Sequence, residues 1–341
     1  MDINNLNAGW FELKRQISLA GYELTTADDN NLKDCEGIIF FNANSIRKPI
    51  DFIEKIKNIL KGLLRKKVIL PYPTRDLYAE ALRFGLKNKM ILVIWEPKTV
   101  LSSNFDPKTW EKFDRILTWD DDLLLKNQKF NRFYVPMESN KVLEKAIPFQ
   151  RKKLLVNMSH NKYSSYKCEL YSARRNTSTY FDTHYPNDFD LFGNRWNKPV
   201  TLWQRLFPGT VKKYSTYRGN AKNKCETLSQ YKFNLCYENT SDARGYVCDK
   251  IFTSFHVRSV PVYWGASNIE DYIDTDTFVD RRRFGNDKAL AQFLTQMTEG
   301  EYNKYLIAAE RFMQSDEYKK FLPENFGRTI VEALRLTKIN T

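Results

Sequence analysis

The sequence predicts an α/β protein made of two Rossmann-like domains that face each other across a cleft. Short apolar runs alternate with longer helical patterns, as expected for repeated βαβ units and parallel sheets. The apolar pattern fades once, near the middle of the chain, and then starts again. The length of 341 residues also fits two domains, because single domains commonly contain about 100–200 residues.

The first half of the chain is expected to supply the strands of one sheet. Its buried strands are predicted at 37–41, 68–70, 90–95 and 115–119. A helical segment over 10–20 opens this half, where a Rossmann-like domain usually begins with a strand. Between the first two runs, residues 52–67 have apolar positions on one helical face and lysines opposite. Such a face most often packs on its own sheet, and peripheral docking on an acidic membrane is the alternative.

The second half repeats the pattern. Its strands are predicted at 154–156, 189–193, 233–237 and 260–264, with a helical tail over 327–338. Residues 136–151 lack apolar periodicity and have a proline near each end, as is typical of a linker.

We therefore divide the chain into three parts. Two Rossmann-like domains are predicted, one over 1–150 and one over 151–325. A C-terminal helix within 326–341 is expected to cross back to the first domain. Ligands bind outside the carboxyl ends of parallel strands, so both sets of strand ends should face the cleft. This is the GT-B arrangement of glycosyltransferases, although other two-domain α/β enzymes share it.

Composition narrows the classes of partner. The formal net charge of +13 favours an anionic ligand. The basic residues are spread along the chain without a nucleic-acid-binding motif, so we expect no nucleic acid partner. The five cysteines are scattered and odd in number, which favours reduced thiols in the cytoplasm. We see no signal peptide and no apolar run of the roughly 20 residues that span a bilayer, and loss of an upstream anchor remains open.

Polar residues gather after the predicted strand 233–237. Glu238 and Asn239 follow it directly, and a helix is expected to begin near Tyr246 with Lys250 in its first turns. A helix N-terminus with a lysine suits a diphosphate.

One residue earlier, Asp249 offers a carboxylate for ribose hydroxyls. Solvated charges at a helix start are the alternative interpretation for both Asp249 and Lys250. His256, further along the same helix, is expected to pack rather than to catalyse.

The order of residues in this region resembles a known signature. Aromatic-Glu-Asn-Thr, then Tyr-Val-x-acid-Lys, then Val-Pro-Val-x-x-Gly is similar to the donor-binding signature of family 10 α-1,3/1,4-fucosyltransferases. The preceding LSQYKFNLC at 228–236 is especially similar to the bacterial members. An ordered signature of this length is far more specific than a lone short motif.

The resemblance implies a metal-independent, inverting transferase. It would move L-fucose from GDP-β-L-fucose to a hydroxyl of a GlcNAc- or Glc-type acceptor glycan. The family's donor-contacting tyrosine falls on Tyr246, its phosphate-contacting lysine on Lys250 and its ribose-contacting glutamate on Asp249. Asp249 is one methylene shorter, and Cys248 stands where the family has threonine. These two departures leave a different nucleotide sugar open as the donor.

The family's diphosphate-contacting arginine aligns best with Lys167, and Arg174 and Arg175 are its rivals. Lysine keeps the charge but lacks the planar fork of arginine. Glu238 and Asn239 are expected to belong to the same donor site.

The resemblance extends into the first half of the chain. LVIWEP at 92–97 and FDRILTWDD at 113–121 are similar to the acceptor domain of bacterial members. The family's general base, a glutamate at the carboxyl end of a strand, falls on Glu96. Inverting transfer needs such a base to take the proton of the attacking hydroxyl. A loop carboxylate without catalytic function is the alternative, as is a non-catalytic nucleotide- or carbohydrate-binding module for the whole chain.

The acidic run 120–122 invites a metal interpretation, because GT-A transferases hold a divalent ion with an Asp-x-Asp motif. The run lies far in sequence from the nucleotide signature and directly precedes three leucines. An aspartate that caps a helix explains it better. We therefore expect no metal site and no required cofactor, with divalent ions at most stimulatory.

Overall fold

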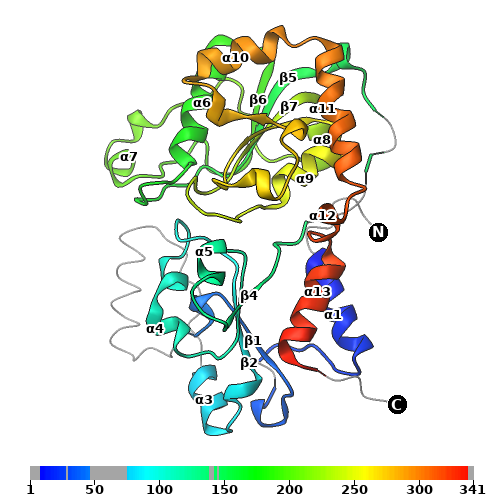
Figure 1. The fold of residues 1–341 in the computed structure, drawn as a ribbon. Helices are drawn as coiled ribbons and strands as arrows, with labels where there is room; N and C mark the ends of the chain where they lie inside the picture. The colour runs from blue at the N-terminus through cyan, green and yellow to red at the C-terminus, as the bar shows by residue number, and fades with distance from the viewer. Residues whose placement is uncertain (1–7, 28–29, 47–74, 138–141, 144–145, 337–341) are drawn as a thin grey trace.

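The computed structural model describes residues 8–27, 30–46, 75–137, 142–143 and 146–336. The predicted strand at 68–70 and the amphipathic segment 52–67 lie outside the described residues. Figure 1 shows two α/β units stacked one above the other, with the N-terminal and C-terminal helices side by side in the lower one.

The first domain contains a parallel sheet in the order β1-β2-β3-β4. Its strands are β1 (Ile38–Phe41), β2 (Met90–Ile94), β3 (Ile116–Thr118) and β4 (Phe130–Arg132). The first three coincide with predicted strands. The prediction missed β4, because only Phe130 of its three residues is buried and no apolar run marks it.

The helices in the described part of this domain are short apart from the first. They are α1 (Ala8–Leu19), α3 (Leu77–Arg83), α4 (Pro107–Trp110) and α5 (Asp121–Leu124). In the described part of the domain a helix, α1, comes first, as the sequence predicts.

The second domain contains a parallel sheet in the order β6-β5-β7-β8-β9. Its strands are β5 (Lys153–Met158), β6 (Phe189–Phe192), β7 (Tyr231–Tyr237), β8 (Val260–Trp264) and β9 (Val279–Asp280). Four of the five were predicted, and β9 is too short to leave an apolar pattern.

Helices cover this second sheet and continue beyond it. They are α6 (Tyr171–His184), α7 (Leu202–Leu206), α8 (Lys224–Ser229), α9 (Asp249–His256), α10 (Asp287–Gln296), α11 (Glu299–Phe312), α12 (Asp316–Lys319) and α13 (Pro323–Leu334). None of the described helices is long and apolar enough to cross a bilayer.

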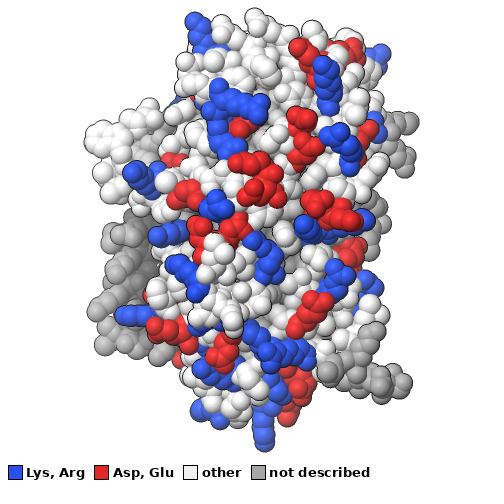
Figure 2. All heavy atoms as spheres, viewed as in Figure 1, with Lys and Arg blue, Asp and Glu red and all other residues white. Residues whose placement is uncertain are grey.

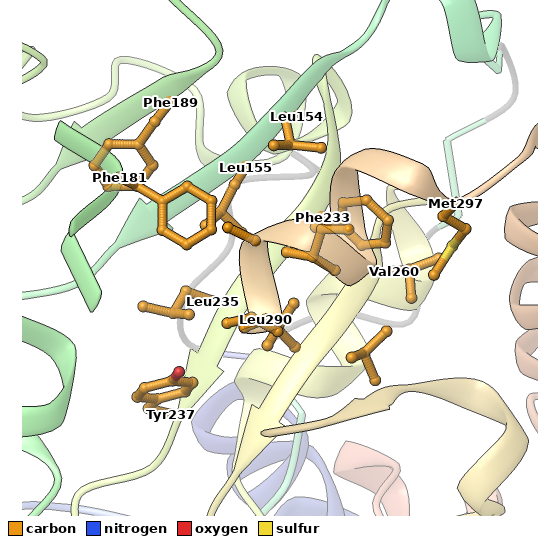
Figure 3. Close-up of a cluster of buried hydrophobic side chains, with 14 of the residues drawn as sticks. Leu154, Leu155, Phe181, Phe189, Phe233, Leu235, Tyr237, Val260, Leu290 and Met297 are labelled. Carbon is orange, nitrogen blue, oxygen red and sulfur yellow. The ribbon is translucent and has the colours of Figure 1, made fainter. Parts of the chain in front are cut away.

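Apolar strands buried on both faces hold the second domain together. Leu155, Phe233, Leu235 and Val260 are all at most 4% exposed and pack against Leu290 of α10. Figure 3 shows these side chains between the sheet and the helices above it. Parallel strands enclosed in this way become continuous apolar runs, which is why the sequence revealed them.

Charged groups of both signs are mixed over the surface. Figure 2 shows Lys and Arg interspersed with Asp and Glu on the face in view, without one dominant basic patch.

The C-terminal helix α13 returns to the first domain and packs against α1. Phe326 and Ile330 of α13 are buried in the same core as Leu13 and Ile17 of α1. The helices approach so closely that a Cβ added at Gly327 would lie 3.2 Å from the carbonyl oxygen of Glu12. The helix that was predicted over 327–338 begins earlier, at Pro323. The fixed φ of proline suits the first turn of a helix.

Asp121 links the two domains. It lies in the first domain, but its carboxylate accepts hydrogen bonds from Tyr272 Oη at 2.5 Å and Asn268 Nδ2 at 2.8 Å in the second. It also pairs with Arg132. Burial alone would raise the pKa of Asp121, but the hydrogen bonds from Tyr272, Arg132 and Asn268 outweigh burial and lower it. The ionised carboxylate is therefore part of the interdomain contact.

The backbone of Gly245 completes this contact. Gly245 has φ +80°, and a Cβ there would lie 2.4 Å from the carbonyl oxygen of Trp119. Its N–H donates to Asn268 Oδ1 at 3.0 Å. Only glycine combines this backbone conformation with such a close approach.

Gly245→Ala should therefore destabilise the protein by about 2–4 kcal/mol, because steric conflict adds to backbone strain. Gly219 provides the control: its φ is +76°, but nothing lies within 4 Å of an added Cβ. Gly219→Ala should cost only about 1 kcal/mol. Urea unfolding of both variants measures the difference, and equal losses would show that the contact with Trp119 does not matter.

Candidate active site between the two domains

Two adjoining cavities open where the carboxyl ends of both sheets meet. The cavity between the domains has about 250 Å³ and is lined by Trp95 and Glu96 of the first domain and by Tyr246 and Lys250 of the second. The other has about 230 Å³ and lies within the second domain. Both cavities are lined by Asn239, Asp249 and Lys250. The structure thus brings five of the predicted site residues together: Glu96, Asn239, Tyr246, Asp249 and Lys250.

A larger hollow of about 800 Å³ lies elsewhere, between α10 and α11. None of the predicted site residues lines it. The chemistry of the lining residues, rather than size, identifies the two adjoining cavities as the candidate site.

A buried ion pair positions Lys250. Its Nζ lies 2.7 Å from Glu238 Oε2, and the Glu238 side chain is fully buried. Burial alone would lower the pKa of Lys250, but the Glu238 carboxylate and its acidic neighbours outweigh it and raise the pKa. Lys250 therefore stays charged.

Glu238 lines neither cavity, although the sequence placed it in the donor site. Its other oxygen accepts the backbone N–H of Cys248 at 3.1 Å. It therefore positions the start of α9 and the lysine beside it. Removing one partner of such a buried pair typically costs about 3–5 kcal/mol.

The helix that carries Lys250 begins later than predicted. The sequence placed its start near Tyr246, but α9 begins at Asp249 with Cys248 as the N-cap residue. The backbone before it is not helical: Cys248 is extended, with φ −106° and ψ 178°, and Tyr246 and Val247 are buried in the core. The shift puts Lys250 in the first turn, where the positive end of the helix dipole adds to its charge.

Tyr246 and Asn239 hold each other in place. The Tyr246 ring packs on Trp119 of the first domain, with centroids 4.7 Å apart. Its hydroxyl accepts a hydrogen bond from Asn239 Nδ2 at 3.2 Å. Asn239 Oδ1 in turn accepts from Arg174 Nη2 at 3.2 Å.

Arg174, rather than Lys167, lines one of the two cavities. Lys167 is exposed and lines neither of them. Arg174 comes from α6, is 4% exposed and lines the cavity of the second domain. It donates to the carbonyl oxygens of Tyr237 and Glu238, both at 2.6 Å. Lys167 precedes α6 in a loop, whereas α6 directs Arg174 toward the end of β7.

Further cations line the same space and were missed in the sequence. Lys224 of α8 pairs with Asp249 at 3.1 Å, and Lys162 follows β5. No motif contains these two lysines. The net positive charge of the chain was the only feature of the sequence that favoured additional cations at the site.

Glu96 faces these cations from the first domain. Its backbone N–H and that of Trp95 donate to Asn42 Oδ1 at 2.8 and 2.9 Å. Asn104 Nδ2 donates to the same oxygen and to the carbonyl of Glu96, both at 2.8 Å. Burial raises the pKa of Glu96, and the ammonium groups of Lys162 and Lys250 oppose this only in part.

The three aspartates of the acidic run 120–122 have structural roles. Asp120 caps α5 by accepting the N–H of Leu123 at 3.0 Å, as the sequence predicts. Asp121 belongs to the interdomain contact, and Asp122 pairs with Arg244 at 3.4 Å. In the part of the chain that the structure describes, no three His, Cys, Asp or Glu side chains are grouped to hold a metal.

His256 lies at the C-terminal end of α9, away from the cavities. Its Nε2 is 2.8 Å from Tyr318 Oη, and burial lowers its pKa to about 4. It is a neutral packing residue at physiological pH. The five cysteines are free thiols.

Comparison with known proteins identifies the second domain. Residues 157–324 match the family described as "Glycosyltransferase family 10 (fucosyltransferase) C-term". Over these residues the second domain is similar to glycosyltransferase family 10. The matched residues include the donor signature and Arg174, whereas Glu96 lies outside them.

Curated fucosyltransferases match this chain over short segments. Alpha-(1,3)-fucosyltransferase FucT of Helicobacter pylori is 36% identical over 124 residues, which are 33% of this chain and 25% of the relative. Alpha-(1,4)-fucosyltransferase of Arabidopsis thaliana is 37% identical over 70 residues, 20% of this chain and 17% of the relative. The matched segments thus span a quarter or less of these relatives.

Solved structures show the fold of the whole chain. A crystal structure of an alpha1,3-fucosyltransferase has a TM-score of 0.50 at 17% identity and covers 96% of both chains. A DNA-modifying beta-glucosyltransferase has a TM-score of 0.52 at 12% identity, covering 95% of this chain and 93% of its own. Both likenesses concern the fold, which is GT-B.

Proposed function

We propose that this protein transfers L-fucose from GDP-β-L-fucose to a hydroxyl of an acceptor glycan, with inversion at the anomeric carbon. The product would be an α-1,3 or α-1,4 linkage to a GlcNAc- or Glc-type sugar. The observation that carries the proposal is one cavity lined by a carboxylate, Glu96, from one domain and by an ammonium, Lys250, from the other. The family description and the α-1,3- and α-1,4-specific relatives support it.

In the proposed reaction Glu96 acts as the general base. It takes the proton of the acceptor hydroxyl while that oxygen attacks the anomeric carbon of fucose. The bond between this carbon and the diphosphate oxygen breaks on the opposite side, and GDP leaves with the electron pair. Because burial raises the pKa of Glu96, its carboxylate is a stronger base than an exposed glutamate.

Lys250 and Arg174 would stabilise the departing diphosphate. Both are fixed before substrate arrives, Lys250 by Glu238 and Arg174 by carbonyl oxygens at the end of β7. Preorganised cations in a site that excludes water stabilise developing charge better than solvent does. The N-terminus of α9 adds its dipole at the same place.

The proposed reaction needs no metal cofactor. The cationic side chains at the second-domain cavity can neutralise the charge of a leaving diphosphate, as a divalent ion would. They are Lys162, Arg174, Lys224 and Lys250. The aspartates of the acidic run are engaged in the cap and in the interdomain contacts.

The acceptor sugar would bind beside Glu96 on the first domain. Trp10 and Trp95 line the same cavity, stacked with centroids 6.0 Å apart and an interplanar angle of 15°. Flat aromatic surfaces with a few polar groups are typical of small-molecule sites. We also place the reaction in the cytoplasm, since the cysteines are free thiols.

A different GDP- or nucleotide-sugar is the second candidate donor. Asp249 is shorter than the glutamate of the family and is paired with Lys224. Its carboxylate is therefore drawn toward α8, which changes the surroundings offered to the ribose or the sugar.

Thermal melting with nucleotides tests the donor. GDP should raise Tm more than UDP or CMP at equal concentration, because ligand stabilisation grows with affinity, reaching about 2.7 kcal/mol at 100 times Kd. Mass spectrometry of products from a nucleotide-sugar panel with lactose and N-acetyllactosamine then identifies the sugar. A larger shift with UDP, or transfer from a UDP-sugar, would exclude GDP-fucose, and transfer from none would favour a binding module.

Glu96→Gln and Lys250→Ala should fail in different ways. Glu96→Gln removes the base but not a donor contact, so kcat should fall by roughly 10²-fold while GDP affinity stays near wild type. Lys250→Ala should weaken both GDP binding and turnover. Calorimetry with GDP beside steady-state kinetics separates them, with Glu111→Gln on the surface of the first domain as the control.

The pH profile gives a second readout of the same role. Below its raised pKa, Glu96 is protonated and cannot accept the proton, so kcat should rise with pH through a value above the ordinary 4.3 of glutamate. Near-normal kcat in Glu96→Gln would remove the role, and Asp120 would be the next carboxylate to test.

A further inference from the structure

A short helix with exposed apolar side chains projects from the second domain. In Figure 1, α7 lies at the far left of this domain, away from its sheet. Three of its residues and its C-cap carry large exposed apolar groups, namely Leu202 at 70%, Trp203 at 61%, Leu206 at 66% and the C-cap Phe207 at 48%. We call these four residues the α7 tip. In the same view, Figure 2 shows a lobe at this place that is largely free of charged atoms.

The α7 tip is held rigidly rather than frayed. Thr201 and Gln204 form a capping box. The Thr201 hydroxyl accepts the backbone N–H of Gln204, and the Gln204 side chain accepts the backbone N–H of Thr201. Trp203 and Phe207 pack on each other with centroids 4.1 Å apart. Below the tip, the buried Trp196 donates its indole N–H to the carbonyl of Ser159 at 2.7 Å. An ordered turn thus presents apolar groups to the outside.

The segment around the tip is entirely basic. Residues 191–225 contain no Asp or Glu, and their cations are Arg195, Lys198, Arg205, Lys212, Lys213, Arg218, Lys222 and Lys224. Some pair with acids outside the segment, such as Arg218 with Asp190. Lys198 and Lys213, close to α7 in sequence, are exposed.

We propose that the α7 tip inserts into the surface of an anionic lipid bilayer. Tryptophan, phenylalanine and leucine flanked by lysine and arginine are typical of segments that lie in the headgroup region, with apolar groups about 5–10 Å deep. Each basic residue near an anionic leaflet adds electrostatic attraction. A peripheral contact of this kind needs no membrane-spanning helix.

Charge argues against a second copy of the chain, another protein or a nucleic acid as the partner of the α7 tip. A symmetric dimer through the α7 tip would bring the basic segment against its own copy, and like charges would oppose the contact. Protein interfaces are generally depleted in lysine, whereas lysines lie on both sides of α7. A nucleic acid would use the cations but leave the four apolar groups in water.

Sedimentation with vesicles tests the proposal on the full chain. Wild-type protein should bind vesicles that contain phosphatidylglycerol, less so at high salt, and bind pure phosphatidylcholine weakly. The double variant Trp203→Ser/Phe207→Ser should lose at least about tenfold in partitioning. Its Tm should be unchanged, because both side chains are exposed. Leu125→Ser, at an 86% exposed leucine of the first domain, is the matched control.

Three outcomes would overturn the proposal. Wild-type protein that ignores anionic vesicles would do so, and so would a double variant that binds them as well as wild type. A concentration-dependent dimer, seen by light scattering and dispersed by the double variant, would assign the α7 tip to self-association. Transfer activity on a soluble acceptor should be the same in all variants, so the result does not depend on the proposed reaction.

Discussion

The contact of Asp121 with Tyr272 and Asn268 sets how the two domains stand against each other. Glu96 belongs to the first domain and Lys250 to the second. Neither sheet alone therefore fixes the position of one side chain relative to the other. That relation depends on the Asp121 carboxylate, on Gly245 beneath the Trp119 carbonyl, and on the packing of α13 on α1. The proposed chemistry requires all three, because base and leaving group must lie on opposite sides of one carbon atom.

A second constraint operates inside the second domain. Fully buried Glu238 binds Lys250 and the N–H of Cys248, so one carboxylate positions a cation and starts a helix. The carbonyl oxygens of Tyr237 and Glu238 hold Arg174 in the same way. Backbone and side chain at the end of β7 thus orient both cations before a donor binds, which limits the reorganisation that catalysis would require.

The sequence predicts most strands, because strands buried on both faces are apolar throughout. It misses β4 and β9, which have three and two residues and little apolar signal. Among the predicted site residues, the resemblance to the family pointed to Tyr246, Lys250 and Glu96, and the structure places all three at one cavity. Arg174 was only a rival of Lys167 in the alignment, and Lys224 was missed, because α6 and α8 carry these two residues to the cavity from separate parts of the chain. The sequence predicted Glu238 to be a residue of the donor site. Only the folded structure shows that its side chain is fully buried and pairs with Lys250 instead of lining a cavity.

The central claim is that the Asp121 contact aligns the base of one domain with the donor site of the other. Asp121→Asn should lower kcat at least about tenfold while the GDP dissociation constant stays within about twofold, since the donor residues lie in the second domain. Asp122→Asn, which alters an exposed pair with Arg244, is the control and should leave both unchanged. Kinetics and GDP calorimetry at a temperature where every variant is folded provide the measurement. An unchanged kcat in Asp121→Asn, or loss of GDP affinity in proportion to kcat, would contradict the account.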